Sequence, residues 1–121
     1  MSLIFTERNI ELILQGKKTQ TRRIWKRIKV KKGGIYKIKR HIFSKKHYGL
    51  IQVTDIRKEK LGNITEEDAK KEGYGSVAEF KKVWEEIYGR WNPEQEVYVI
   101  EFKLLDGNPP LKERRQESKS I

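Results

Sequence analysis

The sequence predicts a small α+β fold in which a mixed sheet or a closed barrel carries a few helices. The length of 121 residues suits one domain and is short for two. Segments with strand-like alternation outnumber segments with helical spacing. The N-terminal and C-terminal segments must also meet, because neither of them alone could enclose a core.

The first predicted element is a helix over residues 7–15. Thr6 can cap its N-terminus, and Gly16 provides a stop. Three apolar residues share one face of this helix: Ile10, Ile13 and Leu14. After Gly16 the pattern favours a strand.

Two further strands are predicted in the middle of the chain. Gly33 and Gly34 mark a turn, and a strand over residues 35–43 follows it. Three apolar residues alternate with polar ones on that strand: Tyr36, Ile38 and Ile42. Arg40 interrupts this apolar face and is expected near its rim. Another strand is predicted over residues 48–56.

Two helices are predicted next, each with a recognisable start. Thr65 opens a short helix as T-x-x-D, and Ser76 opens a longer one as S-x-x-E, a capping box closed by Glu79. Gly89 ends the longer helix. Five residues at helical spacing on it are interpreted as core: Val77, Phe80, Trp84, Ile87 and Tyr88.

A last strand is predicted over residues 96–105. Four residues are expected on one apolar face of it: Tyr98, Ile100, Phe102 and Leu104. Residues 106–121 are polar and contain two adjacent prolines, which is typical of a disordered tail. The predicted domain therefore covers residues 1–105.

Composition excludes several classes of function. The chain has no cysteine, so disulfides, thiolate catalysis and cysteine-bound zinc are excluded, and with only His41 and His47 we expect no metal site and no cofactor. No apolar run approaches the roughly 20 residues of a membrane span, and no secretory signal is visible, which indicates a cytoplasmic protein. Abundant Lys, Glu and Ile with a single Met lean toward a thermophile.

The net charge of +11 is unevenly distributed. Residues 1–58 hold 17 Lys and Arg against 3 Asp and Glu, whereas residues 59–121 hold 11 against 14. Residues 12–54 contain no acid, and 14 positive side chains lie within residues 17–46. Because such dense like charges repel, a polyanion such as RNA is the favoured compensator. A solvated basic face, or one facing an acidic membrane or protein surface, are the alternatives.

Three stretches, in order, resemble the ASCH domain family, a relative of the PUA domain of RNA-modifying enzymes. The segment ILQGKKTQTRR, residues 13–23, is similar to the family motif at five positions: Gly16, Lys18, Thr19, Thr21 and Arg23. Residues 69–89 resemble the family's helical insertion, and residues 97–105 resemble its closing strand. The resemblance implies a PUA-like β-barrel of five or six strands with flanking helices, a cleft beside the first motif, and RNA or nucleotide ligands.

The resemblance also implies candidate catalytic residues. Some bacterial members of the family hydrolyse the acetyl amide of N-acetylated cytidine with a lysine, a threonine and a glutamate, which correspond here to Lys18, Thr21 and Glu72. Other members have been described as ribonucleases. From the residues alone, Lys18 could instead contact a phosphate or be exposed, Thr21 could be a strand residue chosen for β-propensity, and Glu72 could be a solvated helix residue.

The chemistry sets two conditions on these residues. Lys18 can act as a base only as the neutral amine; burial or neighbouring cations would lower its pKa, whereas contact with Glu72 would raise it. In addition, a regular strand would point Lys18 and Thr21 to opposite sides, so they converge only if the chain bends after Gly16.

We therefore predict a monomeric RNA- or nucleotide-binding ASCH domain with a basic cleft lined by residues 16–23, and no metal. The alternatives are a metal-independent hydrolase, either an amidohydrolase on a modified nucleoside or a ribonuclease, and a basic face for an acidic partner protein. Trp25 is the best candidate for stacking on a base, with core packing as the alternative. The predicted RNA or phosphate contacts are Lys17, Lys18, Thr19, Arg22, Arg23, Trp25, Lys26, Arg27 and Arg40.

Overall fold

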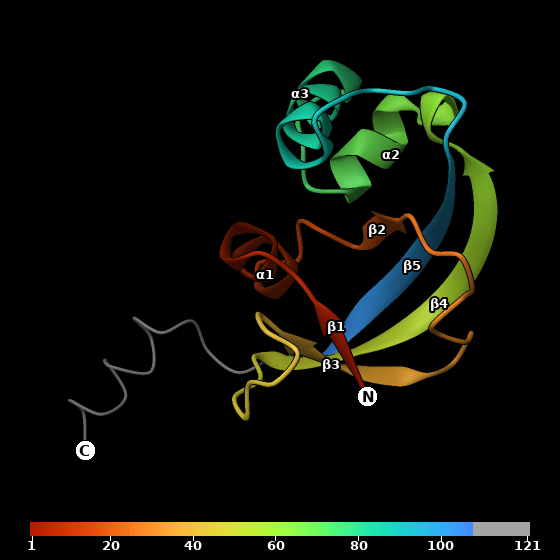
Figure 1. The fold of residues 1–121 in the computed structure, drawn as a ribbon. Helices are drawn as coiled ribbons and strands as arrows, with labels where there is room; N and C mark the ends of the chain where they lie inside the picture. The colour runs from red at the N-terminus through yellow and green to blue at the C-terminus, as the bar shows by residue number, and fades with distance from the viewer. Residues whose placement is uncertain (108–121) are drawn as a thin grey trace.

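The computed structural model describes residues 1–107, which form five strands, three α-helices and one short 3-10 helix (Figure 1). In chain order these are β1 (Ser2–Ile4), α1 (Glu7–Leu14), β2 (Gln20–Arg23), β3 (Ile35–Lys39), β4 (Gly49–Lys60), the 3-10 helix (Leu61–Asn63), α2 (Glu66–Lys71), α3 (Val77–Tyr88) and β5 (Glu96–Gly107). None of the helices in this part of the chain has the length and apolarity to cross a membrane.

The strands form one mixed sheet in the order β1-β3-β4-β5-β2. Only the β1–β3 pair is parallel, and the long β4 and β5 form a curved antiparallel ribbon along its middle (Figure 1). This confirms the predicted α+β class. The sheet is open rather than closed, but the Arg23 guanidinium on the β2 edge donates a hydrogen bond to the Ile4 carbonyl on the β1 edge (2.8 Å).

Two hydrophobic cores lie on the two faces of β5. The first joins α1 to the sheet and includes Ile100 and Phe102, and the second joins α2 and α3 to Val97 and Val99. Tyr98, Ile100 and Phe102 share the face toward the first core, as predicted, and the opposite face is covered as well, by the second core. The strand also runs to Gly107, and Leu104 is partly exposed at its uncovered end.

The predicted strand over residues 35–43 ends early, at Lys39. Ile42 and Phe43 lie beyond it and are 67% and 94% exposed, so the predicted apolar face stops at Ile38. In contrast, β4 continues past the predicted end at residue 56 because β5 pairs with it as far as Lys60. Of the predicted disordered tail, residues 108–121 lie outside the described part of the chain.

The helix starts follow the predicted caps with one difference. Thr6 and Ser76 each accept a hydrogen bond from a backbone amide three residues ahead, and Thr65 forms a complete capping box with Asp68. Glu79, however, accepts from the Gly75 amide rather than closing a box on Ser76. On α3 the predicted core residues divide: Phe80 and Trp84 are buried and Val77 is partly buried, whereas Ile87 and Tyr88 are exposed.

Candidate functional site

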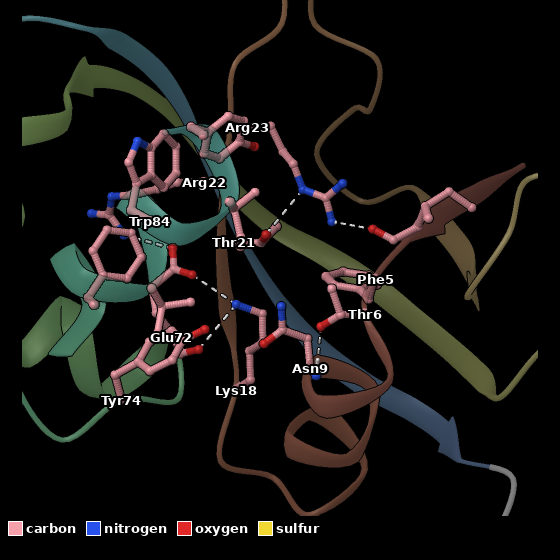
Figure 2. A pocket seen from close by; sticks show the side chains of 15 residues that line it. Phe5, Thr6, Asn9, Lys18, Thr21, Arg22, Arg23, Glu72, Tyr74 and Trp84 are labelled. Atoms are coloured by element: carbon pink, nitrogen blue, oxygen red, sulfur yellow. Dashed lines mark hydrogen bonds and ion pairs between the residues drawn. The ribbon is translucent and has the colours of Figure 1, made fainter. Parts of the chain in front are cut away.

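A pocket of about 650 Å³ opens between the start of α1, strand β2 and helix α3 (Figure 2). Its polar lining residues are Thr6, Asn9, Lys18, Thr21, Arg22, Arg23 and Glu72. Its apolar lining residues are Ile4, Phe5, Tyr74, Phe80, Val83, Trp84, Ile87 and Tyr88. The three residues predicted as catalytic from the resemblance therefore line one pocket.

The bend after α1 brings Lys18 and Thr21 to the same side. Gly16 adopts a φ of 77°, and the Lys17 and Lys18 amides both donate to the Leu12 carbonyl, which turns the chain before β2 begins. Lys18 thus precedes the regular strand and does not follow its alternation. This is the bend that glycine permits at a helix end.

Lys18 is paired with Glu72 inside the protein. The two residues are each 3% exposed. The Lys18 ammonium donates to Glu72 Oε1 (2.8 Å) and to the Glu72 carbonyl (3.1 Å), as Figure 2 shows. Glu72 is held there by the turn after α2, where Gly73 adopts a φ of 100°. The readings of Lys18 and Glu72 as exposed or solvated residues were therefore wrong.

Arg22 holds the Glu72 carboxylate by the oxygen that Lys18 does not contact. Its Nη1 donates to Glu72 Oε2 (3.0 Å) and to Gln20, and its Nη2 lies 3.0 Å from Glu59 Oε2 and 3.4 Å from Asp68 Oδ2. The Arg22 side chain is 0% exposed, so in this structure it has no surface to offer the phosphate contact that was predicted for it. Successive β2 side chains point to opposite faces, which explains why Arg22 and Arg23 diverge.

Thr21 accepts a hydrogen bond from Arg23, which lies on the same face of β2. Arg23 Nε donates to Thr21 Oγ1 (3.2 Å), while the same guanidinium lies 4.7 Å from the centroid of the Phe5 ring. The Thr21 oxygen therefore acts as an acceptor toward Arg23, and its own proton remains available to a base. A positive charge beside this oxygen also favours negative charge on it.

Burial lowers the pKa of Lys18 below its ordinary value of 10.5. The charge and hydrogen bond of Glu72 oppose this shift, and the cations of Arg23 and Arg22 add to it. Both influences predicted from the sequence are thus present, and burial outweighs the carboxylate. Only the neutral amine of Lys18 can accept a proton. Because the pKa is lowered, forming this neutral amine costs less free energy than it does in an exposed lysine.

Two features of the pocket were missed by the sequence reasoning. The Trp84 and Tyr88 rings lie 4.3 Å apart, but their helical spacing indicated core packing and offered nothing to distinguish a ligand-facing wall. Asn9 lies in the first turns of α1, and its buried Oδ1 has no hydrogen-bond partner. No sequence signal singled out this asparagine, since its unsatisfied state depends on residues distant in the chain.

The other predicted contacts lie outside the pocket. Four of them are exposed cations: Lys17, Lys26, Arg27 and Arg40, the last of which pairs with Glu7. The Thr19 amide donates to the Lys71 carbonyl. Trp25 is half-buried against the first core, with its ring 6.2 Å from that of Tyr98. Within residues 1–107, no three His, Asp or Glu side chains gather as a metal site would require.

Comparison with known proteins agrees with this architecture. The structure matches an ASCH domain from Lactobacillus crispatus with a TM-score of 0.71, at 15% identity over 88% of this chain and 78% of that one. It matches the hypothetical protein PH0355 with a TM-score of 0.63, at 27% identity over 84% and 94% of the two chains. It matches an ASCH protein from Zymomonas mobilis with a TM-score of 0.58, at 15% identity over 99% and 93%.

The sequence comparisons complete the assignment. No curated protein matches the chain. The family model described as the ASCH domain matches residues 3–106, which is nearly the whole of the described structure. The predicted PUA-like fold class is thereby confirmed. The chain belongs to the ASCH domain family.

Proposed function

We propose that this protein is an amidohydrolase that removes an acetyl group from the exocyclic amine of a modified cytidine. The observation that carries the proposal is the buried Lys18–Glu72 pair, which lies in the same pocket as the Thr21 hydroxyl. A nucleophile, a base and an acid are the groups that metal-independent amide hydrolysis requires. The activity itself comes from the family resemblance, and the geometry supports it.

Stability alone gives little reason to keep such a pair. Removing two charges from water costs several kcal/mol per ion, and well-packed apolar residues of similar size often serve a fold as well or better. In this pocket the pair also borders aromatic side chains that could have packed without it. Perturbed ionisable groups of this kind, gathered in a cleft, are typical of functional sites.

The proposed reaction uses a proton that the pair can shift internally. Transfer from the Lys18 ammonium to the Glu72 carboxylate, across 2.8 Å, gives a neutral amine and a neutral acid. Lys18 then takes the Thr21 proton as the Thr21 oxygen bonds to the acetyl carbon. Arg23, beside the Thr21 oxygen, favours the loss of that proton, and the carbonyl electron pair moves onto the acetyl oxygen. The C–N bond breaks, and the departing nitrogen takes the proton from Glu72.

Water completes the cycle. Its oxygen adds to the carbonyl carbon of the Thr21 ester, and one of its protons passes to Glu72. Lys18 returns its proton to the Thr21 oxygen as the ester bond breaks and acetic acid leaves. Lys18 and Glu72 are then both neutral, as they were at the start of the attack, and Thr21 again carries its hydroxyl.

The pocket is suited to a single base with its sugar. The Trp84 and Tyr88 rings offer faces on which a base can stack, and the buried Asn9 Oδ1 offers an unused hydrogen-bond acceptor. A phosphate chain alone would need neither feature.

RNA binding is a second candidate, favoured by cations outside the pocket. Lys26, Arg27 and Lys29 are exposed and form no ion pair with any acid in residues 1–107. They would contact RNA phosphates without taking part in the chemistry. The two candidates are compatible, because the exposed cations and the buried pair occupy different places.

Turnover of N-acetylated cytidine, alone and beside labelled single-stranded RNA, tests the proposal. Lys18→Arg keeps a positive charge but cannot supply a neutral amine, so deacetylation should fall by roughly 10²–10⁴-fold. Thr21→Ala should abolish it, and Thr21→Ser should retain part of it. Lys17→Arg, the same substitution at the exposed neighbour, is the control and should change nothing.

Each opposing result has a definite meaning. If wild type deacetylates no acetylated nucleoside, and if Lys18→Arg binds RNA as wild type does, the amidohydrolase proposal fails and the binding function stands. Cleavage of the labelled RNA by wild type would instead assign a ribonuclease.

A further inference from the structure

A second pocket, of about 470 Å³, lies beside the first and shares a wall with it. The shared wall is the ring pair of Trp84 and Tyr88, which lines both pockets. The other lining residues are Ile24, Arg90, Asn92 and Gln95. Ile24 follows β2 directly, and the remaining three belong to the segment after α3, so the second pocket lies where these two segments meet.

The second pocket combines flat apolar surfaces with one cation. Tyr88 is 47% exposed and Ile24 is 42% exposed, so both present apolar surface that the cores leave uncovered. Arg90 is also exposed, and its guanidinium forms no ion pair or hydrogen bond within residues 1–107. A ring platform beside a free guanidinium is suited to a ligand that has both a planar face and an anionic group.

Resting on the function proposed above, we propose that the second pocket receives the nucleotide next to the modified one, so that the substrate is single-stranded RNA rather than a free nucleoside. The neighbouring base packs against Tyr88 and Ile24. Arg90 contacts a phosphate of the linkage. Because one ring pair separates the two pockets, adjacent bases of one strand can occupy both.

The path of the chain beyond this pocket supports a longer polyanion. From Ile24 the chain continues through Lys26, Arg27 and Lys29, all exposed and all without an acidic partner in residues 1–107. A free nucleoside held in the first pocket would leave these charges unused. A strand that passes through the second pocket would bring its phosphates toward them.

The test compares N-acetylated cytidine as a free nucleoside with the same nucleoside as the middle residue of a trinucleotide. Arg90→Ala removes the cation of the second pocket without touching a residue of the first. Lys82→Ala is the matched control, since it removes an exposed positive charge from α3 and lines neither pocket. Both kcat/KM and Kd are measured for each substrate.

We expect wild type to prefer the trinucleotide. Arg90→Ala should lower kcat/KM for the trinucleotide about tenfold, as the loss of one charged hydrogen bond predicts. It should change kcat/KM for the free nucleoside by no more than about twofold. Lys82→Ala should change kcat/KM by no more than about twofold for either substrate. Raising the salt concentration should weaken trinucleotide binding and spare the nucleoside.

The inference is overturned if wild type treats the two substrates alike, or if Arg90→Ala affects both equally or neither. If neither substrate turns over, the amidohydrolase proposal fails but the second pocket is still tested by Kd. Selective loss of trinucleotide binding in Arg90→Ala would then support it, and absent or unchanged binding would refute it.

Discussion

Removing the Glu72 carboxylate tests the electrostatics of the site most directly. Glu72→Gln keeps the size of the side chain but leaves the Lys18 ammonium, 3% exposed, with no carboxylate. Arg22 is affected less, because Glu59 and Asp68 remain at 3.0 and 3.4 Å. Breaking a buried ion pair from one side costs about 3–5 kcal/mol. We expect a loss near the lower end, about 3 kcal/mol of unfolding free energy.

The free energy of deprotonating Lys18 is an upper limit on how much its unpaired charge can lower the stability of Glu72→Gln. Lys18 can avoid being a buried charge by losing its proton. Deprotonation costs about 1.4 kcal/mol for each pH unit between the solution pH and the ordinary pKa of 10.5, which is about 4.8 kcal/mol at pH 7. At pH 9 this limit falls to about 2 kcal/mol. Without Glu72 the folded-state pKa of Lys18 falls further below its unfolded value. Between those two values the unfolded chain binds more protons, so unfolding free energy rises with pH.

The partner variants sharpen the prediction. Lys18→Met leaves Glu72 paired with Arg22 at 3.0 Å and should cost about 1.5–3 kcal/mol, the scale of one charged hydrogen bond. The double variant Lys18→Met/Glu72→Gln buries no orphaned ammonium, so it should be more stable than Glu72→Gln alone. Urea unfolding followed by tryptophan fluorescence, at pH 7 and pH 9, gives each free energy. Additive losses, or a Glu72→Gln cost that does not shrink at pH 9, would refute the reasoning.

Three further outcomes are expected. Deacetylation should fall as the pH rises through the lowered pKa of Lys18, because the reaction needs the proton that Lys18 and Glu72 share; a rate that keeps rising across that pKa in a pH–rate profile would exclude the shared-proton cycle. Gly73→Ala should lower both stability and turnover, because the added Cβ would lie 2.9 Å from Leu12 and 3.6 Å from Lys18 Cβ. Gly16→Ala is the control: Gly16 also has a positive φ, but its added Cβ would meet no atom within 4 Å, so the measured turnover should be kept. Trp25→Ala should lower the melting temperature, because the ring packs on the core. An unchanged melting curve would instead favour Trp25 as a residue that stacks on an RNA base.

Helix starts could be predicted from the sequence because a cap depends on neighbouring residues. Thr6 and Thr65 each bond an amide three positions ahead, so the whole interaction lies within one short segment. The end of α3 at Gly89, with a φ of 82°, is equally local. These features need no knowledge of the rest of the fold.

Strand ends could not be predicted in the same way, because a partner strand sets them. The alternating pattern around Ile42 continues past Lys39, but β3 stops there, where Lys39 pairs with Ile4 at the end of β1. On the other side, β4 extends to Lys60 because β5 supplies Glu96 as its partner. Side-chain alternation shows which face is apolar, whereas hydrogen-bonded length depends on a segment elsewhere in the chain.

The location of the predicted catalytic residues could be predicted, whereas the orientation of the neighbouring arginines could not. The resemblance selected Lys18, Thr21 and Glu72, and the structure brings them to one pocket. It could not show that Arg22 points away from Arg23, because the carboxylates that hold Arg22 come from residues 37 and 50 positions later. A run of adjacent basic letters carries no information about which of them will be buried.

The basic run therefore divides into two parts with different physical meanings. The charges of Lys18 and Arg22 are compensated inside the protein by Glu72, Glu59 and Asp68, all from the acidic second half of the chain. These two cations lend no support to an RNA interface, although they contribute to the charge count that suggested one. The expectation of RNA binding rests instead on the exposed cations after β2, and a steep loss of RNA affinity with salt must come from them. Neutralising Lys18 or Arg22 should leave that salt dependence unchanged, even where it destroys the site.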